Sequence, residues 1–293
     1  MDKIKGTGAA LVTPFNHDMS VDYDGLESLL SYVIDGGVDY LVLMGTTGES
    51  TSLAKAEKIR VIDFCKRVNN GRLPIVLGIG GNNTINVVAD IKSADLEGVD
   101  AILSVSPSYN NPSQEGIYQH YKALSESCPL PIIVYNVPGR TSSNISAHTT
   151  VRLATDFKNI VGVKEASGDM DQIMRILKDK PSNFVVISGD DSLTLPMIYM
   201  GAEGVISVIG QSHPKEFSDM VSFALSGEQE SANQVHYKLY SFYGALYAEG
   251  NPVGVKACLE CLGICKAVVR LPLIEASSII RIKLGNLLKQ WET

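Results

Sequence analysis

A lysine at the end of a buried strand is the side chain in this sequence best placed to do chemistry. The run from Ile160 to Val163 is apolar, which is typical of a strand buried on both faces of a parallel sheet, and Lys164 follows it directly. Burial makes an ammonium group costly and favours the neutral amine, which can attack a carbonyl carbon. The ordinary alternative is a lysine that extends from the edge of a sheet to solvent. The residues around Lys164 must decide between the two hypotheses.

Several polar side chains follow other apolar runs. Tyr135 lies at the end of one run and Arg140 in the loop after it, while Thr46 and Thr47 follow an earlier run. Neighbouring strands lie about 4.8 Å apart, so Tyr135 and Lys164 would face each other if both point inward. A phenol beside an amine provides the proton donor and acceptor that imine formation requires. Further candidates at strand ends are Tyr109, Gly189 and Ile206.

The periodicity predicts eight strands that alternate with eight amphipathic helices. The expected strands are 6–13, 40–44, 74–80, 101–106, 131–136, 160–164, 184–189 and 204–209. The expected helices are 22–36, 54–68, 86–96, 115–127, 147–155, 170–178, 193–200 and 214–225. This α/β pattern predicts a (β/α)8 barrel over residues 1–226, whose active site would lie at the C-terminal ends of the strands. Residues 227–293 are expected to form a small C-terminal helical domain, with helices 231–249, 253–266 and 276–288.

Composition restricts the possible partners and compartment. The chain has 293 residues, a net charge of −7 and no Lys/Arg-rich block, which argues against nucleic acid and anionic membranes as partners. It has no apolar run near the ~20 residues of a membrane span and no signal peptide, so we expect a cytoplasmic protein. Five cysteines fit a reducing compartment. The spacing of Cys258, Cys261 and Cys265 predicts one buried helix face rather than a metal site.

Alternative motifs for cofactors and metals are weak. Gly78-Ile79-Gly80-Gly81 lacks the last glycine of a dinucleotide fingerprint, and the five histidines show no zinc spacing. Asp190 and Asp191 are expected to cap a helix and face solvent. Glu165 should point away from Lys164, because side chains alternate along a strand. We therefore expect no cofactor and no metal.

Three motifs together resemble the dihydrodipicolinate synthase family of pyruvate-dependent aldolases. They are GTTGES at 45–50, YNVPGRT at 135–141 and GVKEASGD at 162–169. The resemblance extends over nearly the whole chain, through SYNNPSQEG at 108–116, GDD at 189–191, GVISV at 204–208 and NPVGVK at 251–256. It implies an enzyme that condenses pyruvate with L-aspartate 4-semialdehyde, the committed step of lysine and diaminopimelate synthesis. It also implies a homotetramer of two tight dimers.

The resemblance assigns roles to the catalytic candidates. Lys164 would form the Schiff base with pyruvate, and Tyr135 would carry protons, linked through Thr46 to Tyr109. In the family, the tyrosine that matches Tyr109 reaches in from the neighbouring subunit of the dimer.

The substrate-binding candidates are assigned in the same way. Thr47 would hold the carboxylate of pyruvate, and the carbonyl of Ile206 would contact the bound pyruvate. Arg140 would bind the carboxylate of the semialdehyde, and Gly189 would line the pocket through its backbone.

Two alternatives remain beside this assignment. Another pyruvate aldolase, such as a sialic acid or oxo-acid lyase, would share the lysine and the tyrosine. Sialic acid lyases typically carry serine at the position of Thr46 and lack the arginine that matches Arg140. At both positions this chain resembles the synthases. A non-catalytic barrel is disfavoured because both Lys164 and Tyr135 are present.

The chain departs from regulated members of the family at their lysine-binding site. Ser50, Thr51 and Asn82 match that site, but four other positions do not: Lys55 and Lys58 replace histidines, Asn86 replaces glutamate and Ser108 replaces tyrosine. The effector is a cation, so two added ammonium groups and a lost carboxylate should weaken its binding. We expect weak or absent feedback by lysine.

Overall fold

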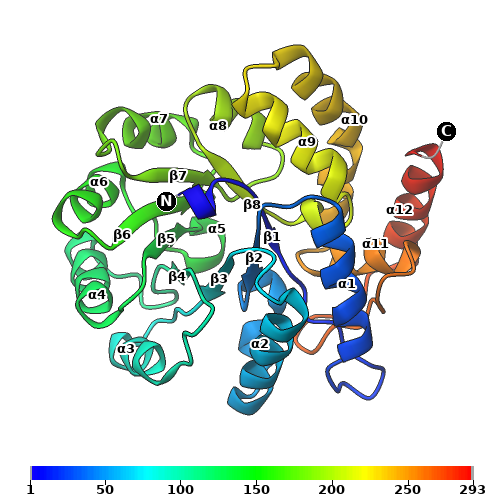
Figure 1. The fold of residues 1–293 in the computed structure, drawn as a ribbon, viewed down its shortest axis with the longest axis horizontal. Coiled ribbons are helices and arrows are strands. Elements are labelled where there is room, and N and C mark those ends of the chain that lie inside the picture. The colour runs from blue at the N-terminus through cyan, green and yellow to red at the C-terminus, as the bar shows by residue number, and fades with distance from the viewer. Residues whose placement is uncertain (1, 292–293) are drawn as a thin grey trace.

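The computed structural model describes residues 2–291 and confirms the predicted barrel (Figure 1). Eight parallel strands pair in chain order and the last closes on the first: β1 Gly6–Ala10, β2 Tyr40–Leu43, β3 Ile75–Gly78, β4 Ala101–Val105, β5 Ile132–Asn136, β6 Ile160–Glu165, β7 Val185–Ser188 and β8 Gly204–Ser207. Parallel neighbours require crossovers, which the amphipathic helices provide. Figure 1 looks nearly along the barrel, so these helices surround the strands.

The eight described helices around the barrel are α1 Tyr23–Asp35, α2 Lys55–Asn69, α3 Thr84–Ser93, α4 Gln114–Ser127, α6 Ala147–Asp156, α7 Met170–Asp179, α8 Thr194–Tyr199 and α9 Pro214–Leu225. Five of them, α1, α3, α4, α6 and α7, begin after a residue whose side chain caps them. Asn83 accepts hydrogen bonds from the backbone N–H groups of Ile85 and Asn86, at 3.1 and 3.2 Å, which starts α3 two residues earlier than predicted. The stretch around Arg140, predicted to be a loop, forms one helical turn, α5 (Pro138–Thr141).

Side-chain alternation divides the core into two layers. One cluster fills the barrel interior and includes Tyr40 and Tyr135, and a larger one lies between strands and helices. Close packing inside the barrel depends on glycine: a Cβ on Gly8 would come within 2.2 Å of the Tyr40 ring. The interior below the active-site end is therefore filled with side chains rather than open.

Three helices follow the barrel: α10 Gln229–Tyr247, α11 Val253–Cys261 and α12 Ser278–Trp291. In Figure 1 they lie beside the barrel, and α10 packs against α9. The division of the chain after residue 226 stays a prediction, because no separation between α9 and α10 marks it.

The predicted extent of α11, and with it the shared cysteine face, was wrong. The helix ends at Cys261 because Gly263 adopts φ +73°, a left-handed conformation that commonly stops helices. Cys265 therefore lies outside the helix, and Cys261 is exposed while Cys258 is buried.

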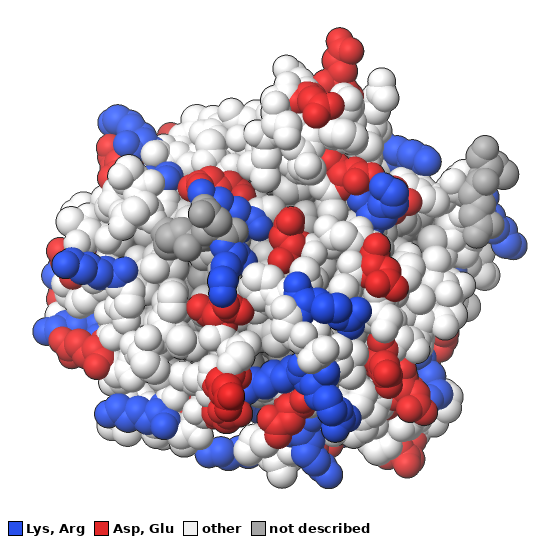
Figure 2. Space-filling model, in the orientation of Figure 1, with Lys and Arg blue, Asp and Glu red and all other residues white. Residues whose placement is uncertain are grey.

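Figure 2 shows the distribution of charged side chains on one face of the molecule. Lysine and arginine side chains there are interspersed with aspartate and glutamate. Within residues 2–291, no helix is both long and apolar enough to cross a membrane.

Two buried histidines should make the fold sensitive to acid. Burial lowers the pKa of His120 and of His213 to about 4, from an ordinary value near 6.5. A lowered pKa in the folded state gives stability that is fully present above pH 6.5 and is lost as the pH falls toward 4. At pH 5 the loss should be roughly 2 kcal/mol per histidine.

Urea unfolding at pH 7.5 and pH 5.0 checks this expectation. His213→Gln should reduce the difference in unfolding free energy between the two pH values by about 2 kcal/mol. His17→Gln is the matched control, because His17 is exposed and should not contribute. An unchanged difference in His213→Gln would contradict the prediction.

Candidate active site

Lys164 lies inside the barrel mouth without a charged partner. Its side chain is 6% exposed, and Nζ lies 4.4 Å from the centre of the Tyr135 ring. The register pairs Tyr135 on β5 directly with Lys164 on β6, as expected from adjacent strands. Within residues 2–291, no carboxylate forms an ion pair with Lys164 and no hydrogen bond to Nζ is present. A buried amine without compensation is energetically poor for folding and well suited to attack a carbonyl.

A second buried lysine, Lys256, has an ion pair and a hydrogen bond that offset the cost of burying its charge. Lys256 is fully buried, and its Nζ lies 2.5 Å from Glu49 Oε1 and 2.8 Å from the carbonyl oxygen of Val268. Burial lowers the pKa of Lys256, and the Glu49 carboxylate opposes that shift. Lys164 has none of these partners, which separates a reactive lysine from a structural one.

A cavity of about 900 Å³ opens above Lys164 at the C-terminal ends of the strands. Its wall brings together seven of the eight residues predicted from sequence: Thr46, Thr47, Tyr135, Arg140, Lys164, Gly189 and Ile206. They come from the ends of five different strands and from the loops that follow. This position is where (β/α)8 barrels carry their active sites.

Tyr109 is the predicted residue that the structure does not bring to this cavity. Its side chain is 90% exposed, and its backbone has φ +71°, an uncommon conformation for a large side chain. Its backbone N–H donates to the carbonyl of Thr141, at 3.4 Å. A contribution from Tyr109 to the cavity of another subunit stays a prediction.

The two residues predicted to bind carboxylates are joined by one residue from the C-terminal part. Asn251 Nδ2 donates to Thr47 Oγ1 at 2.9 Å, and Arg140 Nη2 donates to the main-chain oxygen of Asn251 at 3.3 Å. Thr47 is buried in the 3₁₀ turn η2 (Thr46–Gly48), whereas Arg140 is exposed at the cavity mouth on α5. A hydroxyl deep in the cavity and a guanidinium at its mouth can bind two anionic groups of one reaction at once.

Glu165 points away from the cavity, as alternation predicts. Its carboxylate accepts hydrogen bonds from the side chains of Asn136 and Gln172 and from the backbone N–H of Ser167. Burial raises the pKa of Glu165, and these hydrogen bonds oppose the shift. The network fixes the end of β6, so Glu165 is structural.

The expectation for Asp191 was wrong, and Asp190 fits it only in part, because Asp190 is half-buried and the N-cap residue of α8 is Leu193. Asp190 Oδ1 accepts from the N–H groups of Ser192 and Leu193 just before α8. Asp191 is 2% exposed and instead accepts from Ser207 Oγ at 2.7 Å and from the backbone N–H groups of Val208 and Ile209, which follow β8. Burial raises its pKa. Its role is to tie the loop after β7 to the end of β8. Within residues 2–291, no group of three His, Cys, Asp or Glu side chains is arranged to hold a metal ion.

Several cavity residues were missed because they lie beyond the barrel strands. They come from α10 and the turn after it: Tyr240, Ser241, Tyr243, Gly244, Tyr247, Gly250 and Asn251. The rule that active-site residues follow barrel strands cannot find them. The only signal in the sequence was the NPVGVK motif, which begins at Asn251.

Gly189 should be required for the position of the lysine. A Cβ at this residue would lie 2.7 Å from Ala166 Cβ and 2.9 Å from Lys164 Cε, so one of them must move. Displacing the amine by a fraction of an ångström should lower kcat/KM by about ten- to a hundredfold in Gly189→Ala. Steady-state kinetics checks this, with Gly285→Ala on α12 as control, since a Cβ there meets nothing within 4 Å and Gly285 does not line the cavity. Equal activity of the two variants would contradict it.

The barrel and its site together indicate a class of enzyme, and the comparisons with known proteins then identify the family. A (β/α)8 barrel that holds an uncompensated lysine in a cavity at the strand ends is typical of enzymes that bind a carbonyl substrate as an imine. The sequence matches the model of the dihydrodipicolinate synthetase family over residues 3–291. The chain belongs to that family.

Individual relatives agree with this assignment. The 4-hydroxy-tetrahydrodipicolinate synthase of Flavobacterium psychrophilum is 52% identical over 290 residues, which cover 99% of each chain. The crystal structure of the chloride-inhibited dihydrodipicolinate synthase of Acinetobacter baumannii with pyruvate is 40% identical, covers 98% of each chain and has a TM-score of 0.94. The synthase of Cyanidioschyzon merolae with lysine bound is 35% identical, covers 97% of each chain and has a TM-score of 0.93.

Proposed function

We propose that the protein condenses pyruvate with L-aspartate 4-semialdehyde to give 4-hydroxy-tetrahydrodipicolinate, through an imine on Lys164. The observation that carries the assignment of Lys164 is its burial without an ion pair, 4.4 Å from the Tyr135 ring. The neutral amine adds to the keto carbon of pyruvate and water leaves, which forms the imine. Loss of a methyl proton gives an enamine, whose carbon adds to the aldehyde. The amine of the semialdehyde then displaces Lys164 and closes the ring.

Proton transfer in these steps is assigned to Tyr135. Its phenol adjoins the amine and can protonate the leaving hydroxyl and later accept a proton. Thr46 lines the same cavity and can pass protons onward, and Tyr109 of a neighbouring subunit would complete the path. A homotetramer built from two dimers, in the cytoplasm, fits this arrangement. Analytical ultracentrifugation tests the assembly.

Substrate binding is assigned to separate groups that line the cavity. Thr47 holds the carboxylate of pyruvate next to the Ile206 carbonyl, and Gly189 leaves room for the imine. Arg140 binds the carboxylate of the semialdehyde, where its planar fork of donors matches the anion. No step requires a cofactor or a metal.

Borohydride reduction in the presence of pyruvate tests the imine directly. Peptide mass analysis should find the reduced pyruvate adduct on Lys164 and on no other lysine. An unmodified Lys164 would refute the proposal. Comparison of L-aspartate 4-semialdehyde with sialic acid as substrate then separates the condensation from the reaction of a related lyase.

Feedback by lysine should be weak or absent. The exposed Lys55, the half-buried Lys58 and the neutral Asn86 stand where regulated relatives have histidines and a carboxylate, so the site repels a cationic amino acid. Steady-state rates should stay within about twofold of the uninhibited value at millimolar L-lysine. Half-inhibition at submillimolar L-lysine would contradict this. Asn86→Glu, which restores one carboxylate, should increase sensitivity.

A further inference from the structure

Asn251 connects both anion-binding groups of the cavity, although it lies outside the barrel. Asn251 is 8% exposed and lines the cavity at a position just after α10. The side chain donates to Thr47 Oγ1 at 2.9 Å, while its main-chain oxygen accepts from Arg140 at 3.3 Å. The side chain of Asn251 therefore contacts Thr47, whereas its main chain contacts Arg140.

The direction of the first hydrogen bond determines what Thr47 can do. A hydroxyl carries one proton and two acceptor positions. Because the amide of Asn251 donates to Thr47 Oγ1, the hydroxyl proton is not used in that contact and remains available to a substrate oxygen. An acceptor in place of the amide nitrogen would attract that proton and remove it from the cavity.

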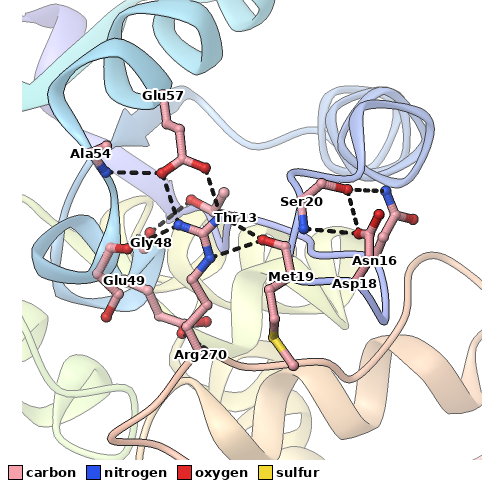
Figure 3. A network of polar contacts seen from close by, with 11 residues as sticks. Thr13, Asn16, Asp18, Met19, Ser20, Gly48, Glu49, Ala54, Glu57 and Arg270 are labelled. Carbon is pink, nitrogen blue, oxygen red and sulfur yellow. Dashed lines mark hydrogen bonds and ion pairs between the residues drawn. The ribbon is translucent and has the colours of Figure 1, made fainter.

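The backbone around Thr47 is held by other contacts (Figure 3). Thr13 Oγ1 donates to the carbonyl of Gly48 at 2.7 Å. The carboxylate of Glu49 binds Lys256 Nζ at 2.5 Å and the backbone N–H of Arg270 at 3.0 Å. These contacts fix the position of the turn but not the rotation of the Thr47 hydroxyl. Asn251 is the described residue that contacts the hydroxyl oxygen.

We propose that Asn251 is a positioning residue: its amide directs the hydroxyl proton of Thr47 toward the carboxylate of the first substrate. This inference rests on the proposed function, in which Thr47 binds pyruvate. Asn251 would act on pyruvate binding through its side chain and on Arg140 through its main chain only. Substitution of the side chain should therefore separate the two substrates.

Asn251→Ala tests that separation. The KM for pyruvate should rise about tenfold, as expected when a hydrogen bond to a charged group is impaired. The KM for the semialdehyde should change by less than about twofold, because the carbonyl that holds Arg140 remains. Equal increases in both KM values, or no increase for pyruvate, would overturn the proposal.

Asn251→Asp distinguishes hydrogen-bond direction from packing. Aspartate has nearly the shape of asparagine, so a purely structural role predicts that it is tolerated better than alanine. The proposal predicts the opposite order, because the carboxylate would accept the Thr47 proton and repel the substrate carboxylate. A lower pyruvate KM for Asn251→Asp than for Asn251→Ala would overturn it.

A double-mutant cycle with Thr47→Val completes the test. If Asn251 acts through the Thr47 hydroxyl, Asn251→Ala should change the pyruvate KM less than twofold in the Thr47→Val background. A tenfold effect in both backgrounds would overturn the inference while leaving the proposed function intact. Failure of borohydride to label Lys164 in the unchanged protein would instead refute the proposed function.

Discussion

Lys164→Met is expected to lose the condensation activity while the protein keeps its stability. Among the described residues that line the cavity, no second lysine could replace Lys164, and the other basic side chain is Arg140, whose guanidinium does not form an imine with a ketone. Without an amine no imine forms, and kcat/KM should fall by at least about a thousandfold. Steady-state kinetics and borohydride trapping with pyruvate measure the loss.

The stability of this variant should not fall, because methionine removes a buried amino group that has no ion pair and keeps most of the volume. Active-site groups commonly cost stability, and their removal often restores it. Lys164→Arg is the matched control: it keeps a cationic side chain but cannot form the imine, so it should be equally inactive. A variant with more than about 1% of the activity, or with a clearly lower unfolding midpoint for Lys164→Met, would contradict the prediction.

Lys256→Met is expected to have the opposite effect and destabilise the fold strongly. The substitution leaves the carboxylate of Glu49 buried without its cation, and unpairing a buried charge typically costs about 3–5 kcal/mol. It also removes the contact of the ammonium with the Phe15 ring, at 4.2 Å. Urea unfolding should show a midpoint well below that of the unchanged protein.

Two controls identify the buried ion pair as the cause. Lys215→Met removes a cation from an exposed i,i+4 pair with Asp219 and should leave the unfolding midpoint nearly unchanged, because solvent screens such a pair. The double variant Glu49→Gln/Lys256→Met has no buried charge and should recover part of the lost stability. Equal stabilities of the Lys215 and Lys256 variants would refute the argument. The predictions thus assign one buried lysine to the reaction and the other to the stability of the fold.

Much of the fold and of the site was accessible from local sequence. Apolar runs alternating with amphipathic helices predict parallel strands with crossovers, and the closed barrel confirms this. Side-chain alternation directs a residue at the end of such a strand to the barrel mouth. The sequence therefore predicts that Lys164 and Tyr135 lie side by side on neighbouring strands, as the register confirms. The family motifs supplied the substrates, which spacing cannot name.

The two errors have different causes. Asp191 was expected to be a solvated capping residue, yet Ser207 and the backbone after β8 donate hydrogen bonds to its carboxylate. That outcome depends on a contact between separate strand ends and does not follow from neighbouring residues. The helical periodicity of 253–266 continues past Cys261, but the left-handed conformation at Gly263 ends the helix, and this is a local signal that the periodicity does not take into account.

By itself the sequence determined the barrel, the reactive lysine and the family, because hydrophobic periodicity and strand-end position are properties of short segments. Only the tertiary structure decided how the site is completed. The segment after α10 folds back over the strand ends, where Asn251 contacts Thr47 across 204 residues of chain and Lys256 reaches Glu49 across 207. Such contacts depend on the packing of the whole chain, and no local pattern of residue types encodes them.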